Sequence, residues 1–104
     1  METVAFRMNL NRGAAEEYKR RHDEIWPELA TVLKQAGVSD YSIWLDEETH
    51  HLFAVLKRSD DHSMDRIPDN EIVRRWWDFM ADIMKTKPDN APVEVPLKKM
   101  FHLP

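Results

Sequence analysis

The sequence predicts an α+β domain, because strand-like and helix-like apolar patterns alternate along one chain of 104 residues. Segments in which every second residue is apolar are typical of half-buried strands, whereas apolar residues at steps of three and four are typical of amphipathic helices. Hydrophobic residues make up 42% of the chain and charged residues 33%, as in folded globular proteins. We therefore expect a single domain over residues 1–104, long enough to enclose one hydrophobic core.

The first strand and the first helix follow from these two periodicities. Residues Thr3–Asn9 alternate between apolar and other side chains, so we expect a strand with one buried face. A helix is expected to begin near Ala14 and to end at Gly37, since glycine tolerates the left-handed conformation common at helix ends. Pro27 removes a helical N–H group, which predicts a kink or break over residues 23–26. The inward stripe of this helix comprises Tyr18, His22, Ile25, Leu29, Val32, Leu33 and Ala36.

The second half of the chain predicts a hairpin, a second helix and a last strand. Asp40–Asp46 and His51–Arg58 alternate on either side of a polar turn, as expected for two antiparallel strands. A strong amphipathic pattern predicts a helix over Glu71–Met84. A proline-bearing loop over Lys85–Val95 then leads to a last strand, which is expected over Leu97–Leu103.

The order strand, helix, strand, strand, helix, strand is that of the ferredoxin-like, or split βαβ, arrangement. In this arrangement the helices lie on one face of the sheet, and an apolar opposite face needs a cover. The predicted strands carry apolar residues on both faces, since Phe53 and Val55 alternate with Leu52 and Ala54. A second copy of the chain is the simplest cover, so we expect a homodimer that packs sheet against sheet.

Composition disfavours several functional classes. The chain has no long apolar run and no cleavable leader pattern, so neither a membrane span nor a signal peptide is expected. It has no cysteine, which removes disulfides, thiol nucleophiles and thiolate metal sites, and a cytoplasmic location is the simplest expectation. A net charge of −4 disfavours nucleic-acid binding, and 2 glycines are too few for a glycine-rich phosphate loop.

His22 is the strongest candidate for acid–base chemistry. It lies on the inward stripe of the first helix, one turn after Tyr18, so both side chains are expected on the same face. A histidine on an apolar stripe is more often a core residue than a functional one. The neighbouring phenol favours the functional interpretation, because a histidine beside polar groups can titrate near neutrality and act as both acid and base.

Trp76 and Trp77 are adjacent on the second helix and therefore point about 100° apart. Either both flank a cleft, or one lies in the core while the other covers the helix rim, and their spacing favours neither arrangement. Indole faces pack well against the C–H faces of a sugar, and indole N–H groups bind hydroxyl groups. Together with Arg74 and Arg75 they also resemble a stacking platform for single-stranded nucleic acid, an alternative that the acidic net charge disfavours.

Metal and nucleophile chemistry find no support in the sequence. His50 and His51 are adjacent in or beside an expected strand, so they point to opposite faces. No histidine–carboxylate pair has the spacing of metal ligands, and no serine lies in a nucleophile elbow. Neither a metal site nor a cofactor is expected. What remains is one acid–base residue among phenols and indoles, a combination suited to proton transfer on a small, neutral, polyhydroxylated ligand.

Six short features stand out along the chain. They are YKRRH at Tyr18–His22, IWPEL at Ile25–Leu29, Tyr41, RWW at Arg75–Trp77, PDNAP at Pro88–Pro92 and FHLP at Phe101–Pro104. Taken together, in this order and at this spacing, they resemble the L-rhamnose mutarotase family. The resemblance extends from the first strand to the last residue and is thinnest between Lys57 and Asn70.

The resemblance implies a dimeric α/β barrel of ferredoxin-like subunits that interconverts the α and β anomers of L-rhamnose. It implies that His22 is the proton donor, and that no metal or cofactor takes part. The residues implied to contact the sugar are Tyr18, Tyr41, Trp76 and Trp77. Tyr18 and His22 are then expected to face a pocket rather than closed core. The second proton carrier is left open among Tyr18, Tyr41 and a bound water.

Two other classes are compatible with the same arrangement. Dimeric barrels also include small monooxygenases and haem-handling proteins, in which a helix histidine can bind iron. A non-catalytic homodimer, in contrast, binds the sugar without changing the rate of anomer exchange. Whatever the class, the apolar end Phe101–Pro104 is expected to reach the partner subunit and help to close its pocket.

Overall fold

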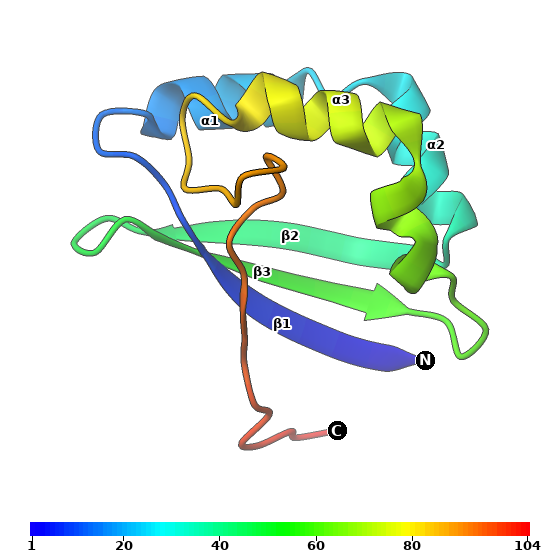
Figure 1. Ribbon diagram of the computed structural model, residues 1–104. Coiled ribbons are helices and arrows are strands. Elements are labelled where there is room, and N and C mark those ends of the chain that lie inside the picture. The colour runs from blue at the N-terminus through cyan, green and yellow to red at the C-terminus, as the bar shows by residue number, and fades with distance from the viewer.

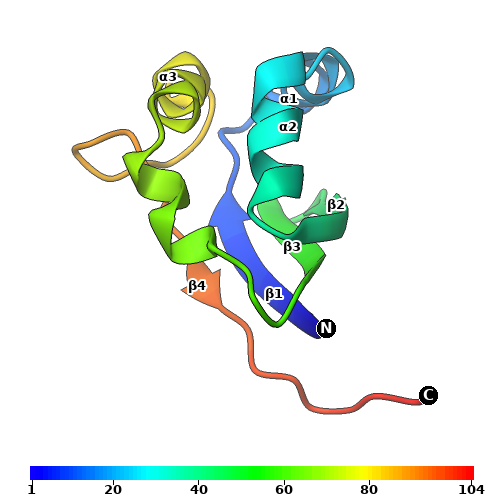
Figure 2. The same cartoon turned by 90° about the vertical axis from the view of Figure 1, so that its right-hand side faces the viewer.

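A four-stranded antiparallel sheet carries helices on one of its faces (Figure 1, Figure 2). The computed structural model describes residues 1–104. Its elements are β1 (Glu2–Asn9), α1 (Ala15–Asp23), α2 (Pro27–Gln35), β2 (Val38–Asp46), β3 (His51–Arg58), the 3-10 helix η1 (Met64–Asp69), α3 (Glu71–Met80) and β4 (Val95–Pro96). The predicted α+β class is confirmed.

The strands lie in the order β2-β3-β1-β4, and each neighbouring pair is antiparallel. In the centre of the sheet, Phe6 of β1 pairs with Ala54 of β3, and Met8 pairs with Leu52. Ala54 and Leu52 are almost completely buried beneath the helices, with 0% and 2% of their surface exposed. Phe53 lies between them in β3 and points to the opposite face, because side chains alternate along a strand.

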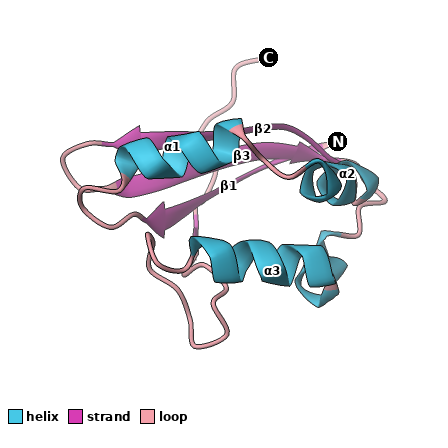
Figure 3. Cartoon of the chain, turned by 90° about the horizontal axis from the view of Figure 1, so that it is seen from above, coloured by secondary structure: helices cyan, strands magenta, loops and turns pink.

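The predicted break before Pro27 divides the first helical segment into α1 and α2, which are separated by three residues. Trp26 is extended (φ −60°, ψ 127°), because the ring of a proline disfavours the helical conformation in the preceding residue. After α2, Gly37 adopts a φ of 94°, a conformation that side chains oppose. Seen from above, α1 and α3 run alongside each other across the same side of the sheet (Figure 3).

The helix α3 is shorter than the sequence predicts. Asn70 caps its first turn, since the side-chain oxygen accepts a hydrogen bond of 2.9 Å from the backbone N–H of Ile72. The predicted end at Met84 is wrong, because α3 ends at Met80. The backbone that follows pairs with the chain after β1, through an antiparallel bridge between Leu10 and Met84. The backbone N–H and C=O groups that make this bridge are then not available for the hydrogen bonds of a longer helix.

The predicted last strand over Leu97–Leu103 is also wrong. The strand β4 consists of Val95–Pro96 alone, paired with the middle of β1. Proline has no N–H group to donate to a neighbouring strand, which limits the pairing at Pro96. A last hydrogen bond of 3.0 Å runs from the backbone N–H of Leu97 to the carbonyl of Ala5. The chain then leaves the sheet and extends beyond the face that carries no helices (Figure 1).

The hydrophobic core lies between the helices and the sheet. Its 12 buried residues are Met8, Leu10, Ala14, Tyr18, Leu29, Leu52, Ala54, Val73, Trp76, Met80, Ile83 and Met84. Two of these, Tyr18 and Trp76, carry a polar group, so the core continues directly into the candidate site. The helices that cover it are short, and none combines the length and the apolar character needed to cross a membrane.

Candidate active site

A cavity of about 1120 Å³ opens between the helices and the sheet. The five residues singled out in the sequence all line it: Tyr18 and His22 from α1, Tyr41 from β2, and Trp76 and Trp77 from α3. The cavity slightly exceeds the usual range of small-molecule sites, about 300–1,000 Å³. The structure thus brings together residues that are up to 59 positions apart in the chain.

The ring of His22 is held between Tyr18 and Trp76. Its Nδ1 lies 3.0 Å from the backbone oxygen of Tyr18, and because a carbonyl only accepts, Nδ1 carries the hydrogen and donates it. The phenol ring of Tyr18 stacks on the imidazole with ring centres 4.3 Å apart, and Trp76 meets it edge-on at 5.4 Å. Nε2 is therefore the nitrogen left free to exchange a proton with a ligand.

Burial lowers the pKa of the His22 imidazole below its usual value of 6.5. The carbonyl of Tyr18 and the charge of Asp23 act in the opposite direction, because both favour the protonated ring. At neutral pH most of the rings are neutral, and the protonated minority is a stronger acid than free imidazole. A group with this pKa can donate a proton and take it back within one catalytic cycle.

The two phenols of the cavity remain protonated at neutral pH. Burial raises the pKa of Tyr18 well above that of free tyrosine, and the nearby Tyr41 adds to this effect. Loss of water also raises the pKa of Tyr41, with a further contribution from the charge of Glu94. Both hydroxyl groups can therefore donate and accept hydrogen bonds, but neither is a phenolate base.

The two tryptophans combine the arrangements that the sequence left open. Trp76 lies in the core, with 8% of its surface exposed, and also lines the cavity. Its indole packs edge-on against Trp26, with ring centres 5.1 Å apart, and at a tilt against Phe79, with ring centres 5.7 Å apart. Trp77 packs against the outside of the core and lines the same cavity. Both indoles therefore flank the cavity, and Trp76 also anchors α3 to the core.

Glu94 lines the cavity from the segment just before β4, and sequence reasoning missed it. Loss of surrounding water raises the pKa of its carboxyl group, and Lys87 opposes that shift. Because a lone carboxylate in a proline-bearing loop has no recognisable pattern, only the folded structure brings it to the site.

The other titratable groups do not form a metal site. No three or more His, Cys, Asp or Glu side chains gather closely enough to hold a metal ion. Nδ1 of His50 instead lies 3.3 Å from Nη1 of Arg12, at the tip of the hairpin. A second cavity, of about 440 Å³, is lined by Met1, Glu2, Thr3, Lys57, Lys99 and His102 and contains none of the predicted site residues.

Fold and cavity together define a class: small α+β proteins with a ligand cavity between their helices and an antiparallel sheet. A family model described as L-rhamnose mutarotase matches residues 3–103. The chain belongs to the L-rhamnose mutarotase family, as its sequence motifs predicted. Membership of this family makes the protein an enzyme of the isomerase class.

Relatives from several bacteria match the chain over its whole length. An L-rhamnose mutarotase from Jannaschia sp. (strain CCS1) is 62% identical over 104 residues, which are 100% of both chains. One from Sinorhizobium fredii (strain NBRC 101917 / NGR234) is 61% identical over 103 residues, 99% of each chain. The crystal structure of an L-rhamnose mutarotase from Formosa agariphila superposes with a TM-score of 0.93 at 53% identity, and the match covers 100% of both chains.

Proposed function

We propose that the protein interconverts the α and β anomers of L-rhamnose, with Nε2 of His22 as the proton donor. The observation that carries the proposal is the coincidence of the family match with a cavity in which one imidazole lies among phenols and indoles. Such a lining suits a neutral sugar, because aromatic faces cover its C–H groups while hydroxyl and N–H groups bind its oxygens.

Anomers exchange by opening and closing the sugar ring. In the opening step the ring oxygen gains a proton while the anomeric hydroxyl loses one, so the C1–O5 bond breaks and a C1 carbonyl forms. Rotation about the C1–C2 bond exposes the other face of the carbonyl, and closure reverses both proton transfers. The net change of protons and electrons is zero, and two groups poised for proton transfer are sufficient.

In this proposal the protonated form of His22 donates from Nε2 to the ring oxygen. Nδ1 cannot take this role, because it is engaged by the backbone oxygen of Tyr18. Tyr18, Tyr41, Trp76 and Trp77 hold the sugar so that its ring oxygen lies within reach of Nε2.

A second group must receive the proton of the anomeric hydroxyl. Tyr18, Tyr41 and a bound water are the candidates that the sequence suggested, and the cavity adds Glu94 to them. The high pKa values of both phenols mean that a tyrosine would act as a relay, accepting one proton while it donates another.

Substitution of His22 tests the role of the imidazole. His22→Ala is expected to slow exchange between the anomers of L-rhamnose by about 10² or more, the usual contribution of a general acid. Saturation transfer between the two anomeric proton resonances measures this rate. His50→Asn is the matched control, since His50 lies at the hairpin tip with a φ of 60° that asparagine tolerates. Exchange at the wild-type rate in folded His22→Ala protein would contradict the proposal.

The two other classes considered from the sequence predict different measurements. A haem-handling protein would show a haem absorbance band after purification or after incubation with haem. A non-catalytic sugar-binding dimer would bind L-rhamnose but leave the saturation transfer unchanged. The proposal predicts that exchange is faster in the presence of the protein, which neither of these classes provides.

We also propose that two chains of ferredoxin-like topology pack sheet against sheet as a dimeric α/β barrel. The strand order β2-β3-β1-β4 and the helices on one face support the topology. On the other face, the registers place Trp44, Phe53 and Arg7 side by side on three neighbouring strands. Trp44 is 67% exposed, and Nε of Arg7 is buried without a hydrogen-bond partner in its own chain. A second copy would cover the indole and offer partners to Arg7.

The C-terminal arm, residues 97–104, supports the same dimer. It extends beyond the helix-free face (Figure 1), where the partner subunit would lie. Its apolar residues Met100, Phe101 and Leu103 are 85%, 79% and 78% exposed, which favours contact with another chain. Deletion of residues 101–104 is expected to weaken the dimer and to lower activity together, as sedimentation and saturation transfer would show. A monomeric truncated chain with full activity would show that each site is complete within one subunit.

Two predictions about the whole chain remain proposals. One is that residues 1–104 form a single mutarotase domain, which the core cluster shared by the helices and the sheet supports. The other is the cytoplasmic location, which fractionation of cells that express the protein would test.

A further inference from the structure

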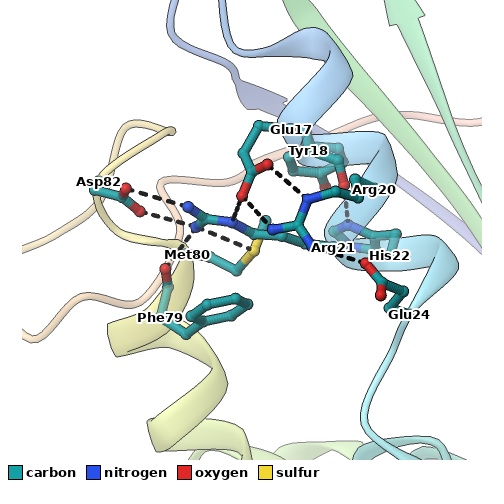
Figure 4. A network of polar contacts seen from close by, with 9 residues as sticks. All are labelled: Glu17, Tyr18, Arg20, Arg21, His22, Glu24, Phe79, Met80 and Asp82. Carbon is teal, nitrogen blue, oxygen red and sulfur yellow. Dashed lines mark hydrogen bonds and ion pairs between the residues drawn. The ribbon is translucent and has the colours of Figure 1, made fainter.

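Arg21 is an arginine with a largely covered side chain that joins α1 to the end of α3. Only 9% of its side chain is exposed, and a cation that has lost much of its contact with water is stabilised by charged partners and hydrogen bonds. Within α1, Nε donates to Oε2 of Glu17 at 2.7 Å. Across the fold, Nη1 and Nη2 donate to the two carboxylate oxygens of Asp82 at 2.9 and 3.2 Å (Figure 4). This bidentate pair fixes both the position and the direction of the guanidinium group.

The same side chain caps the C-terminal end of α3. Nη1 donates to the backbone oxygen of Phe79 at 2.7 Å, one of the last carbonyl groups of the helix, which have no partner within it. The guanidinium group also lies 4.4 Å from the centre of the Phe79 ring. The helix α3 has no basic residue in its own last turn, so Arg21 supplies the positive charge that its C-terminus favours.

These contacts connect Arg21 to the candidate site through both α1 and α3. Phe79 packs against Trp76 at 5.7 Å, Trp76 meets the His22 ring at 5.4 Å, and His22 follows Arg21 directly in α1. Neither Arg21 nor its carboxylate partners line the cavity. Arg21 can therefore affect the cavity through His22 and Trp76, which do line it.

We propose that Arg21 is a positioning residue for the mutarotase reaction: it holds His22 on α1 and Trp76 on α3 at the separation that the sugar requires. The inference rests on the proposed function, since the separation of His22 and Trp76 is the one at which both residues would contact the sugar. A misplacement of about 1 Å in an active site can slow a reaction about 10²-fold, so a tie outside the cavity can control the rate.

Arg21→Met tests this role because it keeps an unbranched, flexible side chain of about the length of the arginine's apolar stem and removes the hydrogen-bond donors. The expected result is a fall in anomer exchange per folded molecule of at least about tenfold, with kcat reduced by a larger factor than KM is raised. Nuclear Overhauser effects between the His22 ring and the Trp76 indole are expected to weaken as well. Arg21→Lys is expected to restore only part of the rate, because an ammonium group cannot bind a carboxylate in a bidentate manner.

Arg20→Met is the matched control, since Arg20 is adjacent, 58% exposed and paired only with Glu17 and Glu24. It is expected to leave the exchange rate and the Overhauser effects unchanged. Folded Arg21→Met protein with the wild-type rate and unchanged Overhauser effects would overturn the inference, whatever its melting temperature, and so would full activity in Arg21→Lys.

If Arg21→Met does not fold, Asp82→Asn carries the test, because Arg21 then keeps its bonds to Glu17 and to the Phe79 carbonyl. A smaller fall in rate is expected, and an unchanged rate would overturn the inference. Failure of the wild-type protein to exchange L-rhamnose anomers would contradict the proposed function alone. The Overhauser effects would still report whether Arg21 sets the separation of His22 and Trp76.

Discussion

Replacement of Trp44 by serine tests the proposed dimer at the most exposed aromatic side chain of the sheet. Trp44 lies on the helix-free face of β2, with 67% of its surface exposed, and pairs with Phe53 of β3. In a sheet-on-sheet dimer this indole would be covered by the partner subunit. Trp44→Ser removes the indole without touching the helices, the core or the cavity lining.

The size of the effect follows from the exposed area. An aromatic side chain buries about 150–250 Å², so an indole that is 67% exposed leaves about 100–170 Å² for a partner to cover. At about 25 cal/mol per Å², covering it contributes about 2.5–4 kcal/mol. A dimer with twofold symmetry loses two such contacts, so association is expected to weaken by about 5–8 kcal/mol, or about 10³- to 10⁶-fold.

Analytical ultracentrifugation over a dilution series measures the dissociation constant of both proteins. The wild-type protein is expected to sediment as a dimer at concentrations where Trp44→Ser sediments as a monomer. Thr31→Ala, an exposed change on α2, is the control and is expected to leave the dissociation constant unchanged. Equal dissociation constants for wild type and Trp44→Ser would refute the reasoning.

Three further predictions concern the site and the charged face of α1. L-rhamnose is expected to change the tryptophan fluorescence, and Trp76→Phe or Trp77→Phe to reduce that change; an undiminished response in both variants would exclude them from the sugar site. Since only protonated His22 donates, kcat/KM is expected to fall about tenfold per pH unit above a folded-state pKa that lies below 6.5. A rise of kcat/KM over the same range would instead make His22 the base. Glu17 has a pKa of about 2 in the folded protein, mainly because two arginines bind it, against 4.5 normally. Its ionised form therefore stabilises the fold above pH 4.5, and this contribution is lost as the pH falls towards 2. Glu17→Gln is expected to flatten the pH dependence of the free energy of unfolding in that window, measured by urea titration.

The parts of the fold that depend on local chemistry were predictable from the sequence. Pro27 predicted the break between α1 and α2, since its missing N–H and its effect on Trp26 act over one turn. The two elements whose ends were wrong depend on distant partners. α3 ends at Met80 because the following residues pair with the chain after β1, and β4 is short because Pro96 limits its pairing.

The candidate site shows the same division. Helical spacing alone placed Tyr18 and His22 on one face, and both line the cavity. Glu94 was missed, because only the fold brings its loop to the cavity. Arg21 was missed for a different reason: it lies in a run of charged residues on α1, and its partner Asp82 lies 61 residues further along the chain.

The rate of exchange between the two anomers of L-rhamnose tests the central claim most directly. Saturation of one anomeric proton resonance, in the presence and absence of the protein, reports whether the other resonance loses intensity through exchange. The proposed function predicts a clear loss with wild-type protein and a loss close to the protein-free level with His22→Ala. A wild-type protein that binds L-rhamnose, as its tryptophan fluorescence would show, yet leaves the transfer at the protein-free level would contradict the account.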